Sequence, residues 1–138
     1  MNAMRVRDLM TDRVLAVGPD DDLCTLHDLM VENGIRHVPV VDSEGNLAGL
    51  VTHRDLLRSS LIEQPNVTSY LEEAMLERVK AAEIMTTGVE TVDPETDLRL
   101  AAQLMLENKY GCLPVTEGSH LVGILTEADF VRLMAEGH

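Results

Sequence analysis

The stretch GLVTHRD at Gly49–Asp55 decides the fold of this chain, because it returns as GILTEAD at Gly123–Asp129. In both stretches a glycine and two aliphatic residues are followed by a Thr, and an Asp stands three positions after that Thr. Aliphatic residues of this kind favour a strand, whereas Thr is a frequent N-cap whose hydroxyl accepts a hydrogen bond from the first turn of a helix. The sequence therefore predicts, twice, a strand that runs directly into a helix.

The duplication extends over most of the chain. A shift of 75 positions aligns Met10–Thr11 with Met85–Thr86, and Pro39 with Pro114. A one-residue deletion in the turn that follows brings the two stretches quoted above into register. So many agreements in one register indicate an internal repeat.

Each copy predicts the element order β-α-β-β-α. Asp22 is a good N-cap for the helix of the first copy, and Asp97 has the same place in the second. The elements expected in the first copy are a strand at Val14–Val17, a helix at Asp22–Asn33, strands at Ile35–Val41 and Leu47–Val51 joined by a turn, and a helix that starts at Thr52 and carries Leu56, Leu57 and Leu61. Two such copies predict an α/β (α+β) fold with two small sheets and helices packed against them.

A linker helix is expected between the copies. Glu63–Thr68 is polar and contains Pro, whereas Ser69–Ile84 has good helix formers and apolar residues at helical spacing. We therefore expect the first repeat at residues 7–62, the linker helix at 63–81 and the second repeat at 82–136. The apolar stripe of this helix must pack on the module itself or on a second chain.

The composition disfavours several classes of function. The 138 residues include 24 acidic and 11 basic side chains, a net charge of −13, which opposes binding to nucleic acids and to anionic membranes. Aromatic residues make up only 2% of the chain, so base-stacking platforms are also disfavoured. No apolar run has the length of a signal peptide or membrane helix, and two cysteines make no disulfide framework. We therefore expect a cytoplasmic protein.

Three pairs of motifs carry a family resemblance. Asp8–Thr11 and Glu83–Thr86 open the copies, Val38–Asp42 and Leu113–Val115 lie in their centres, and the two stretches quoted first close them. This ordered set, which occurs twice, resembles a tandem pair of cystathionine-β-synthase (CBS) motifs. The resemblance covers nearly the whole chain and implies one pseudo-symmetric module with two clefts. Each cleft in this family can hold an adenosine compound such as AMP, ADP, ATP or S-adenosylmethionine.

The resemblance also assigns residues to the two clefts. It implies that the hydroxyls of Thr52 and Thr126 contact phosphate and that the carboxylates of Asp55 and Asp129 accept from the ribose hydroxyls. A helix N-terminus, with its unpaired N–H groups and positive dipole end, agrees with phosphate at the Thr. The adenine walls implied are Ile35, His37 and Pro39 in the first copy and Tyr110, Cys112 and Pro114 in the second. The resemblance also places Ala16 and Thr91 at the borders of the first and second clefts. We further expect Arg36, His53 and Arg54 in the first cleft, because their charge suits phosphate, and Gly111 in the second.

The Thr-x-x-Asp pattern has a second interpretation. A Thr N-cap with an acidic residue at the third helical position resembles a capping box, which explains the hydroxyl and the carboxylate without any ligand. The local sequence does not separate capping from nucleotide binding.

The two copies differ in charge. His53 and Arg54 follow Thr52, with Arg36 and His37 near in sequence, whereas Glu127 and Ala128 follow Thr126. Cationic donors attract phosphate and a carboxylate repels it, so we expect the first cleft to prefer phosphorylated nucleotides. The second cleft would be weaker or take a less anionic adenosine compound. Arg54 has an alternative role as a solvated helix residue in an i,i+4 pattern with Arg58.

No group of residues in the sequence supports catalysis, because no nucleophile and base form a recognisable pair and no GxxxxGK[ST] phosphate loop is present. We expect a regulatory module, not an enzyme, that requires no cofactor and senses cellular energy through an adenine nucleotide. A ligand that binds two states unequally would shift the conformation, and an unknown effector protein or a second subunit would read the change.

Two other functions remain open. The chain can be a dimerisation scaffold with empty clefts, and the apolar faces of Asp22–Asn33 and Asp97–Asn108 are candidates for a homodimer contact. A metal-linked protein is the third interpretation, and it rests only on Cys24 and His27, which share a helix face. A zinc site needs two further ligands, which the sequence does not indicate.

Overall fold

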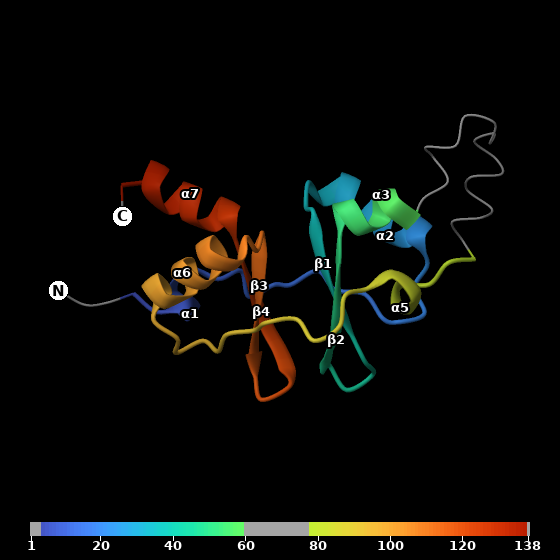
Figure 1. Ribbon diagram of the computed structural model, residues 1–138, viewed down its shortest axis with the longest axis horizontal. Helices are drawn as coiled ribbons and strands as arrows, with labels where there is room; N and C mark the ends of the chain where they lie inside the picture. Colours follow the sequence, from blue (N-terminus) through green and yellow to red (C-terminus); the bar gives the residue numbers. More distant parts are fainter. Residues whose placement is uncertain (1–3, 60–77, 138) are drawn as a thin grey trace. The chain divides into compact units, whose positions relative to one another are not determined.

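The computed structural model describes residues 4–59 and 78–137. Figure 1 shows short helices and two hairpins along the chain. The elements are α1 (Val6–Leu9), α2 (Leu23–Asn33), β1 (His37–Val41), β2 (Leu47–Thr52), α3 (His53–Ser59), α5 (Ala81–Ile84), α6 (Leu98–Asn108), β3 (Cys112–Glu117), β4 (His120–Thr126) and α7 (Glu127–Ala135). This content confirms the predicted α+β class with two antiparallel strand pairs.

The chain divides into two compact units, each built on one hairpin. The first unit contains β1 and β2 and consists of the described residues of Leu15–Val89. The second unit contains β3 and β4 and consists of the described residues of Met1–Val14 and Glu90–His138. The opening segment of each repeat therefore belongs to the unit that holds the other repeat's hairpin.

Backbone hydrogen bonds hold these exchanged segments. In the first unit, Thr86 and Leu50 exchange two N–H···O bonds of 2.9 and 3.0 Å. In the second unit, Thr11 and Ile124 exchange two bonds of 2.9 Å each. The helical turns α5 and α1 that precede these bridges pack on β2 and β4 respectively.

The glycines of the closing motifs make room for these segments. A Cβ on Gly49 would lie 2.6 Å from the Sδ of Met85, and a Cβ on Gly123 would lie 2.6 Å from the Sδ of Met10. Real Cβ atoms do not approach a neighbour so closely, so a side chain at either glycine would push the opening segment away. In both units, the Met of one repeat's opening motif thus packs against the Gly of the other repeat's closing motif.

The helices α2 and α6 are as predicted. The carboxylate of Asp22 accepts a 2.8 Å hydrogen bond from the Thr25 N–H, and that of Asp97 accepts a 2.8 Å bond from the Arg99 N–H. Each helix ends at a left-handed residue, at Gly34 in the first copy.

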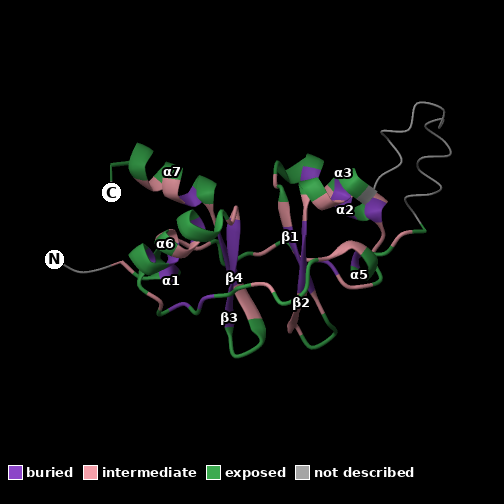
Figure 2. Ribbon diagram, in the orientation of Figure 1, coloured by how far each residue is buried: buried purple, intermediate pink, exposed green. Residues whose placement is uncertain are grey.

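Each unit has its own apolar core, which Figure 2 shows as buried strand centres and inner helix faces. The buried core of the first unit consists of Val17, Leu23, Leu26, Met30, Val38, Val40, Val51, Leu56 and Ala81. The buried core of the second unit consists of Val6, Val92, Leu98, Ala101, Met105, Leu113, Val115 and Leu125. The residue before each Thr, Val51 in β2 and Leu125 in β4, is buried in one of these cores, so packing fixes the end of each strand.

The first strand predicted in each copy is wrong as a regular strand. Only Val17 pairs, in a parallel bridge in which its N–H donates to Pro39 at 3.0 Å and its carbonyl accepts from Val41 at 2.8 Å. Val92 forms the equivalent bridge in the second unit. The turn that starts at Gly18, whose N–H donates to the Asp21 carboxylate, ends the pairing after one residue.

The predicted linker helix differs from the structure where the two can be compared. Within the described residues, helix covers only Ala81–Ile84, and Lys80 before it has extended backbone. The expectation of helix at 78–80 is therefore wrong, because Lys80 forms an antiparallel bridge with Asp22, in which the Leu23 N–H donates to the Val79 carbonyl and the Ala81 N–H donates to the Asp21 carbonyl. The rest of the linker, and Leu61 in the preceding helix, lie outside the described residues.

In the part of the chain that the structure describes, every helix is too short or too polar to cross a membrane.

Candidate functional site

In the first unit the hairpin register gathers the predicted residues of the first repeat. Thr52 at the end of β2 pairs with His37 at the start of β1. The N–H of His53, the first residue of α3, donates a 2.8 Å hydrogen bond to the carbonyl of Arg36. The strand-to-helix turn and the start of β1 therefore lie side by side.

The predicted capping box is present at this turn. The Thr52 N–H donates to Oδ2 of Asp55 at 2.9 Å, and the Asp55 N–H donates to the Thr52 hydroxyl at 3.1 Å. The other carboxylate oxygen, Oδ1, accepts no hydrogen bond from any described residue, and Asp55 is only half-buried. Among the described residues, capping thus uses one oxygen of Asp55 and leaves the second without a donor.

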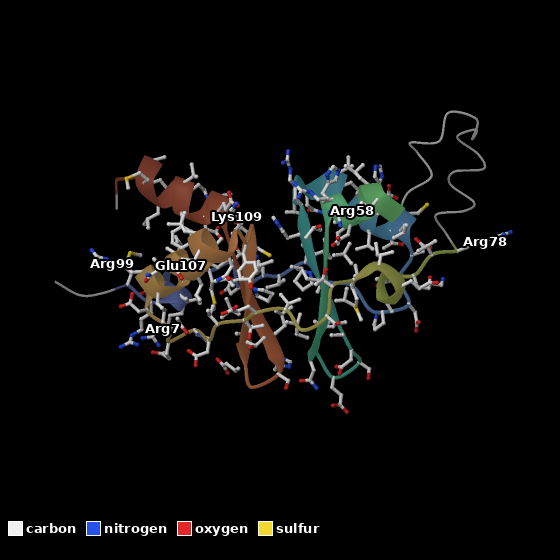
Figure 3. All side chains as sticks on the ribbon, in the orientation of Figure 1. Arg7, Arg58, Arg78, Arg99, Glu107 and Lys109 are labelled. Atoms are coloured by element: carbon white, nitrogen blue, oxygen red, sulfur yellow. The ribbon has the colours of Figure 1, made fainter. Side chains whose placement is uncertain are left out.

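Two arginines and a histidine lie near this turn in sequence. Arg36, His53 and Arg54 are exposed, and no described residue forms an ion pair with them. Arg58 on α3, labelled in Figure 3, is likewise exposed and makes no ion pair with the described part of the chain. The solvated role considered for Arg54 agrees with this exposure, and so does a role in holding an anion.

The predicted adenine wall of the first cleft is apolar where the strand enters the core. Pro39 is buried, while Ile35 and His37 are half-buried. Ala16 precedes Val17, whose N–H donates to the Pro39 carbonyl. The structure therefore brings the predicted wall residues and Ala16 to one region of the first unit.

The second unit repeats this backbone geometry. Thr126 at the end of β4 pairs with Cys112 at the start of β3, and the Glu127 N–H donates to the Gly111 carbonyl at 3.2 Å. The Thr126 N–H and hydroxyl donate to Oδ2 of Asp129 at 2.8 and 3.2 Å. A capping box is thus present in both repeats.

The second unit differs in one ion pair that the sequence analysis missed. Nη2 of Arg132 donates to Oδ1 of Asp129 at 2.5 Å, and Asp129 is only 3% exposed. Both carboxylate oxygens of Asp129 are therefore occupied within the protein. The i,i+3 spacing of Asp129 and Arg132 was a signal for this pair, because residues three apart are neighbours on a helix.

Tyr110, in the predicted adenine wall of the second site, forms a side-chain hydrogen bond. The Tyr110 hydroxyl donates to Oε2 of Glu90 at 3.2 Å, and Glu90 precedes the predicted site residue Thr91. Desolvation and the bond to Glu90 together raise the pKa of Tyr110. Leu15 and Ile35 occupy the equivalent positions in the first repeat, so no such bond forms there.

Cys112 contributes an apolar surface to this wall. The side chain is buried, and burial raises the pKa of its thiol from 9.0 to about 12. The thiol is therefore protonated at neutral pH and has little nucleophilic character. Pro114, two residues further along β3, is also buried.

A pocket of about 430 Å³ lies between the opening segment and α7 in the second unit. The residues that line it are Met4, Asp8, Leu9, Thr11, Asp129, Arg132, Leu133 and Glu136. It includes the Asp129–Arg132 pair but none of the predicted adenine-wall residues.

The metal interpretation gains no ligand set from the structure. Across residues 4–59 and 78–137, no three His, Cys, Asp or Glu side chains come together in a way that could hold a metal ion. The ring of His27 lies beside a carboxylate, with Nδ1 3.7 Å from Oδ1 of Asp28.

Comparison with known proteins identifies the family. The model of the CBS domain matches twice, at residues 6–62 and 81–136. The chain therefore belongs to the CBS domain family, as a tandem pair of these domains. Members of this family generally serve as regulatory domains rather than catalytic ones.

Two solved structures are similar over nearly the whole chain. AcuB from Vibrio cholerae is 33% identical, with a TM-score of 0.83, and the match covers 99% of this chain and 95% of that one. CBSX2 of Arabidopsis thaliana, solved in complex with AMP, is 30% identical with a TM-score of 0.78, covering 96% of this chain and 97% of that one.

A curated relative is much longer than this chain. Homoserine O-acetyltransferase of Methanocorpusculum labreanum is 34% identical over 127 residues, which are 91% of this chain but only 23% of that protein. The chain spans 33% and 42% of the next two curated relatives. The similarity to the acetyltransferase is therefore confined to a minor part of that protein.

Proposed function

We propose that this chain is a regulatory module that binds an adenosine compound, and that its stronger site is in the first unit. The observation that carries the proposal is Asp55, one of whose carboxylate oxygens accepts no hydrogen bond from the described residues. His53 and Arg54 precede it in sequence, and neither they nor Arg36 forms an ion pair with those residues. The similarity to CBSX2, which was crystallised with AMP, supports the same ligand class.

Each part of the ligand has a matching group in the first unit. The available oxygen of Asp55 would accept from the ribose hydroxyls, since a carboxylate is a strong acceptor for a diol. The hydroxyl of Thr52 and the exposed side chains of His53 and Arg54 would donate to phosphate. The adenine would lie against Pro39 and its neighbours on β1.

The regulatory effect would be thermodynamic. A ligand that binds one conformation or association state more tightly shifts the population toward that state. An effector protein, or a second copy of the chain, would then respond to the shift. This mechanism needs neither a catalytic group nor a cofactor in the module itself.

Calorimetric titration of the nucleotide-free protein with AMP, ADP, ATP and S-adenosylmethionine tests the proposal. Asp55→Ala should weaken AMP binding by about 100-fold, because the ribose acceptor is lost. Asp129→Ala is the matched control, since it removes the same capping box from the second repeat and should leave the stronger site intact. No saturable binding of any of these compounds to the wild-type chain would contradict the proposal.

Dimerisation is a second candidate function, and a specific pair of residues favours it. Val31 on α2 and Leu106 on α6 occupy equivalent positions in the two repeats and are 67% and 80% exposed. Exposed aliphatic side chains repeated at the same helix position are suited to a self-complementary contact between two copies.

Sedimentation velocity tests this second function. Leu106→Glu should convert a homodimer to monomers, because burial of a charge in an apolar contact is costly. Val131→Glu, on the exposed side of α7, is the control and should leave the association state unchanged. A wild-type chain that is monomeric at all concentrations would remove the dimer proposal.

A further inference from the structure

We propose that Arg132 is a specificity-determining residue of the second site: its guanidinium occupies the carboxylate of Asp129 and thereby competes with the ribose of an adenosine ligand. This inference rests on the proposed function, because it concerns a second site of the same kind. It assigns a role to a residue outside the predicted set of site residues.

The occupancy of Asp129 is the first step. Oδ2 accepts from the N–H and the hydroxyl of Thr126, and Oδ1 accepts from Arg132. The side chain of Asp129 is 4% exposed, whereas that of Arg132 is 61% exposed. A ribose can therefore reach the carboxylate only if the guanidinium moves away, and the exposed Arg132 side chain is free to do so.

The first repeat supplies the internal comparison. Arg58 stands three residues after Asp55, as Arg132 stands three residues after Asp129. Arg58 nevertheless makes no ion pair with the described residues, and Oδ1 of Asp55 accepts no hydrogen bond from them. The same three-residue spacing thus gives an Asp–Arg ion pair in the second repeat, whereas in the first repeat Oδ1 of Asp55 has no donor among the described residues.

The energetic consequence follows from the type of bond. A hydrogen bond to a carboxylate is charge-assisted for either donor, but the guanidinium also places a positive charge beside the buried carboxylate of Asp129, which a neutral ribose hydroxyl does not. Exchange of Arg132 for a ribose is therefore unfavourable unless the ligand gains elsewhere. We expect the second site to discriminate against ligands that depend mainly on the ribose contact.

Adenosine is the probe that isolates this effect, because it has the ribose but no phosphate. The first site is inactivated by Asp55→Asn, and Arg132→Gln is added to remove the guanidinium while keeping a side chain of similar length. Calorimetry should then show adenosine affinity at the second site at least tenfold higher than with Arg132 present, which corresponds to about 1.4 kcal/mol.

Two controls separate competition from a structural role. Arg58→Gln, introduced into the same Asp55→Asn background, should not change adenosine affinity at the second site. Arg132→Lys keeps a cation that can pair with Asp129 and should restore low affinity. The gain from Arg132→Gln should vanish for 2′,3′-dideoxyadenosine, which lacks both hydroxyls that would replace the guanidinium.

The possible failures are distinguishable. If wild-type protein binds AMP through Asp55 but Arg132→Gln leaves adenosine affinity at the second site equal or lower, the competition by Arg132 is wrong while the proposed function stands. An equal gain for dideoxyadenosine also overturns it, since Arg132 would then act by bulk or general charge. Absence of binding to every variant, with the thermal unfolding transition retained, overturns both the inference and the proposed function.

Discussion

The first and second units have the same backbone at the strand-to-helix turn but different side-chain chemistry around it. Both turns form a capping box, and in both the N–H of the first helical residue donates a backbone hydrogen bond to the carbonyl of the residue before the hairpin's first strand. Near the first turn, Arg36 and Arg54 form no ion pair with the described residues, whereas at the second turn Asp129 forms an ion pair with Arg132. Capping and packing require only the shared residues, so the other positions around the turn can differ without loss of the backbone geometry.

The divergence reverses the local charge. Arg36, His53 and Arg54 in the first repeat correspond to Gly111, Glu127 and Ala128 in the second. Because all of these residues except Gly111 are exposed, their charges act through solvent and their effect depends on ionic strength. The comparison therefore predicts different ligand preferences on equivalent scaffolds.

Exchange of these charges should have the largest effect. The double substitution His53→Glu with Arg54→Ala should lower AMP affinity by about 100-fold, because it replaces cationic donors by a carboxylate next to phosphate. Calorimetry at low and high salt would measure this loss, which should shrink as salt screens the charges.

The reciprocal substitution provides the control. Glu127→His with Ala128→Arg should leave the first site unchanged and improve phosphate binding at the second. Equal AMP affinity of wild type and the first double variant would show that charge does not distinguish the two sites.

Substitution of Gly49 or Gly123 should disrupt the packing of the opening segment on the hairpin. Gly49→Ala should lower the free energy of unfolding by about 2 kcal/mol, because the new Cβ would overlap Met85 and Thr86. Gly123→Ala should have a similar effect through Met10. Urea denaturation measures both changes.

A second substitution checks the cause. Met85→Ala opens space beside residue 49, so the double variant Gly49→Ala, Met85→Ala should lose less stability than the sum of the single variants. Additive losses would show that the Gly–Met contact does not explain the repeated glycine.

Cys112 in the predicted wall of the second site occupies the position that His37 has in the first repeat. Burial holds the folded-state pKa of Cys112 at about 12, against an ordinary value of 9.0. Above pH 9 the unfolded chain releases this proton while the folded chain keeps it, so the free energy of unfolding should fall as pH rises. The slope from this thiol is at most about 1.4 kcal/mol per pH unit, and below pH 9 the thiol contributes no pH dependence.

Urea denaturation of wild type and Cys112→Val between pH 7 and 10 measures this contribution. The stability of wild type should fall more steeply than that of the variant above pH 9. Parallel curves for the two proteins over the whole range would contradict a buried, protonated Cys112.

The smallest effect is expected at Tyr110, whose bond to Glu90 has no equivalent in the first unit. Tyr110→Phe should lower the free energy of unfolding less than either glycine substitution, because the lost hydrogen bond is accessible to solvent. Glu90→Gln keeps an acceptor and should cost less. A double-mutant cycle with no coupling between the two positions would show that the bond does not contribute in solution.

Much of the fold was predictable from residue patterns. The Asp N-caps of α2 and α6, the hairpins and the helix that starts after each Thr depend on local chemistry, and all are present in the structure. The predicted strand at Val14–Val17 was wrong because a strand needs a partner over several residues, and only Val17 has one. The helix predicted at 78–80 was wrong because helical spacing did not reveal that Lys80 pairs with Asp22 in extended backbone before α5 starts.

The residue types of the candidate site were predictable from the sequence, but the hydrogen-bond partners of its two Asp carboxylates were not. The repeat pairs Thr52 with Thr126 and Asp55 with Asp129, and the structure places each Thr at a capping box with its Asp. Nucleotide contact by these residues, as assigned through the family resemblance, stays a proposal. The sequence did not distinguish the two carboxylates, since the same three-residue spacing to an arginine follows both.

The sequence by itself determined the duplication, the element types and the membership of the CBS family, because these follow from local propensities and from motifs that repeat in one register. Only the tertiary structure decided that each opening segment packs on the other repeat's hairpin, and that Arg132 pairs with Asp129 while Arg58 makes no ion pair with Asp55. The physical reason is that segment exchange and ion pairing depend on which surfaces meet in space and how deeply they are buried. Neither quantity is contained in the spacing of residues along the chain.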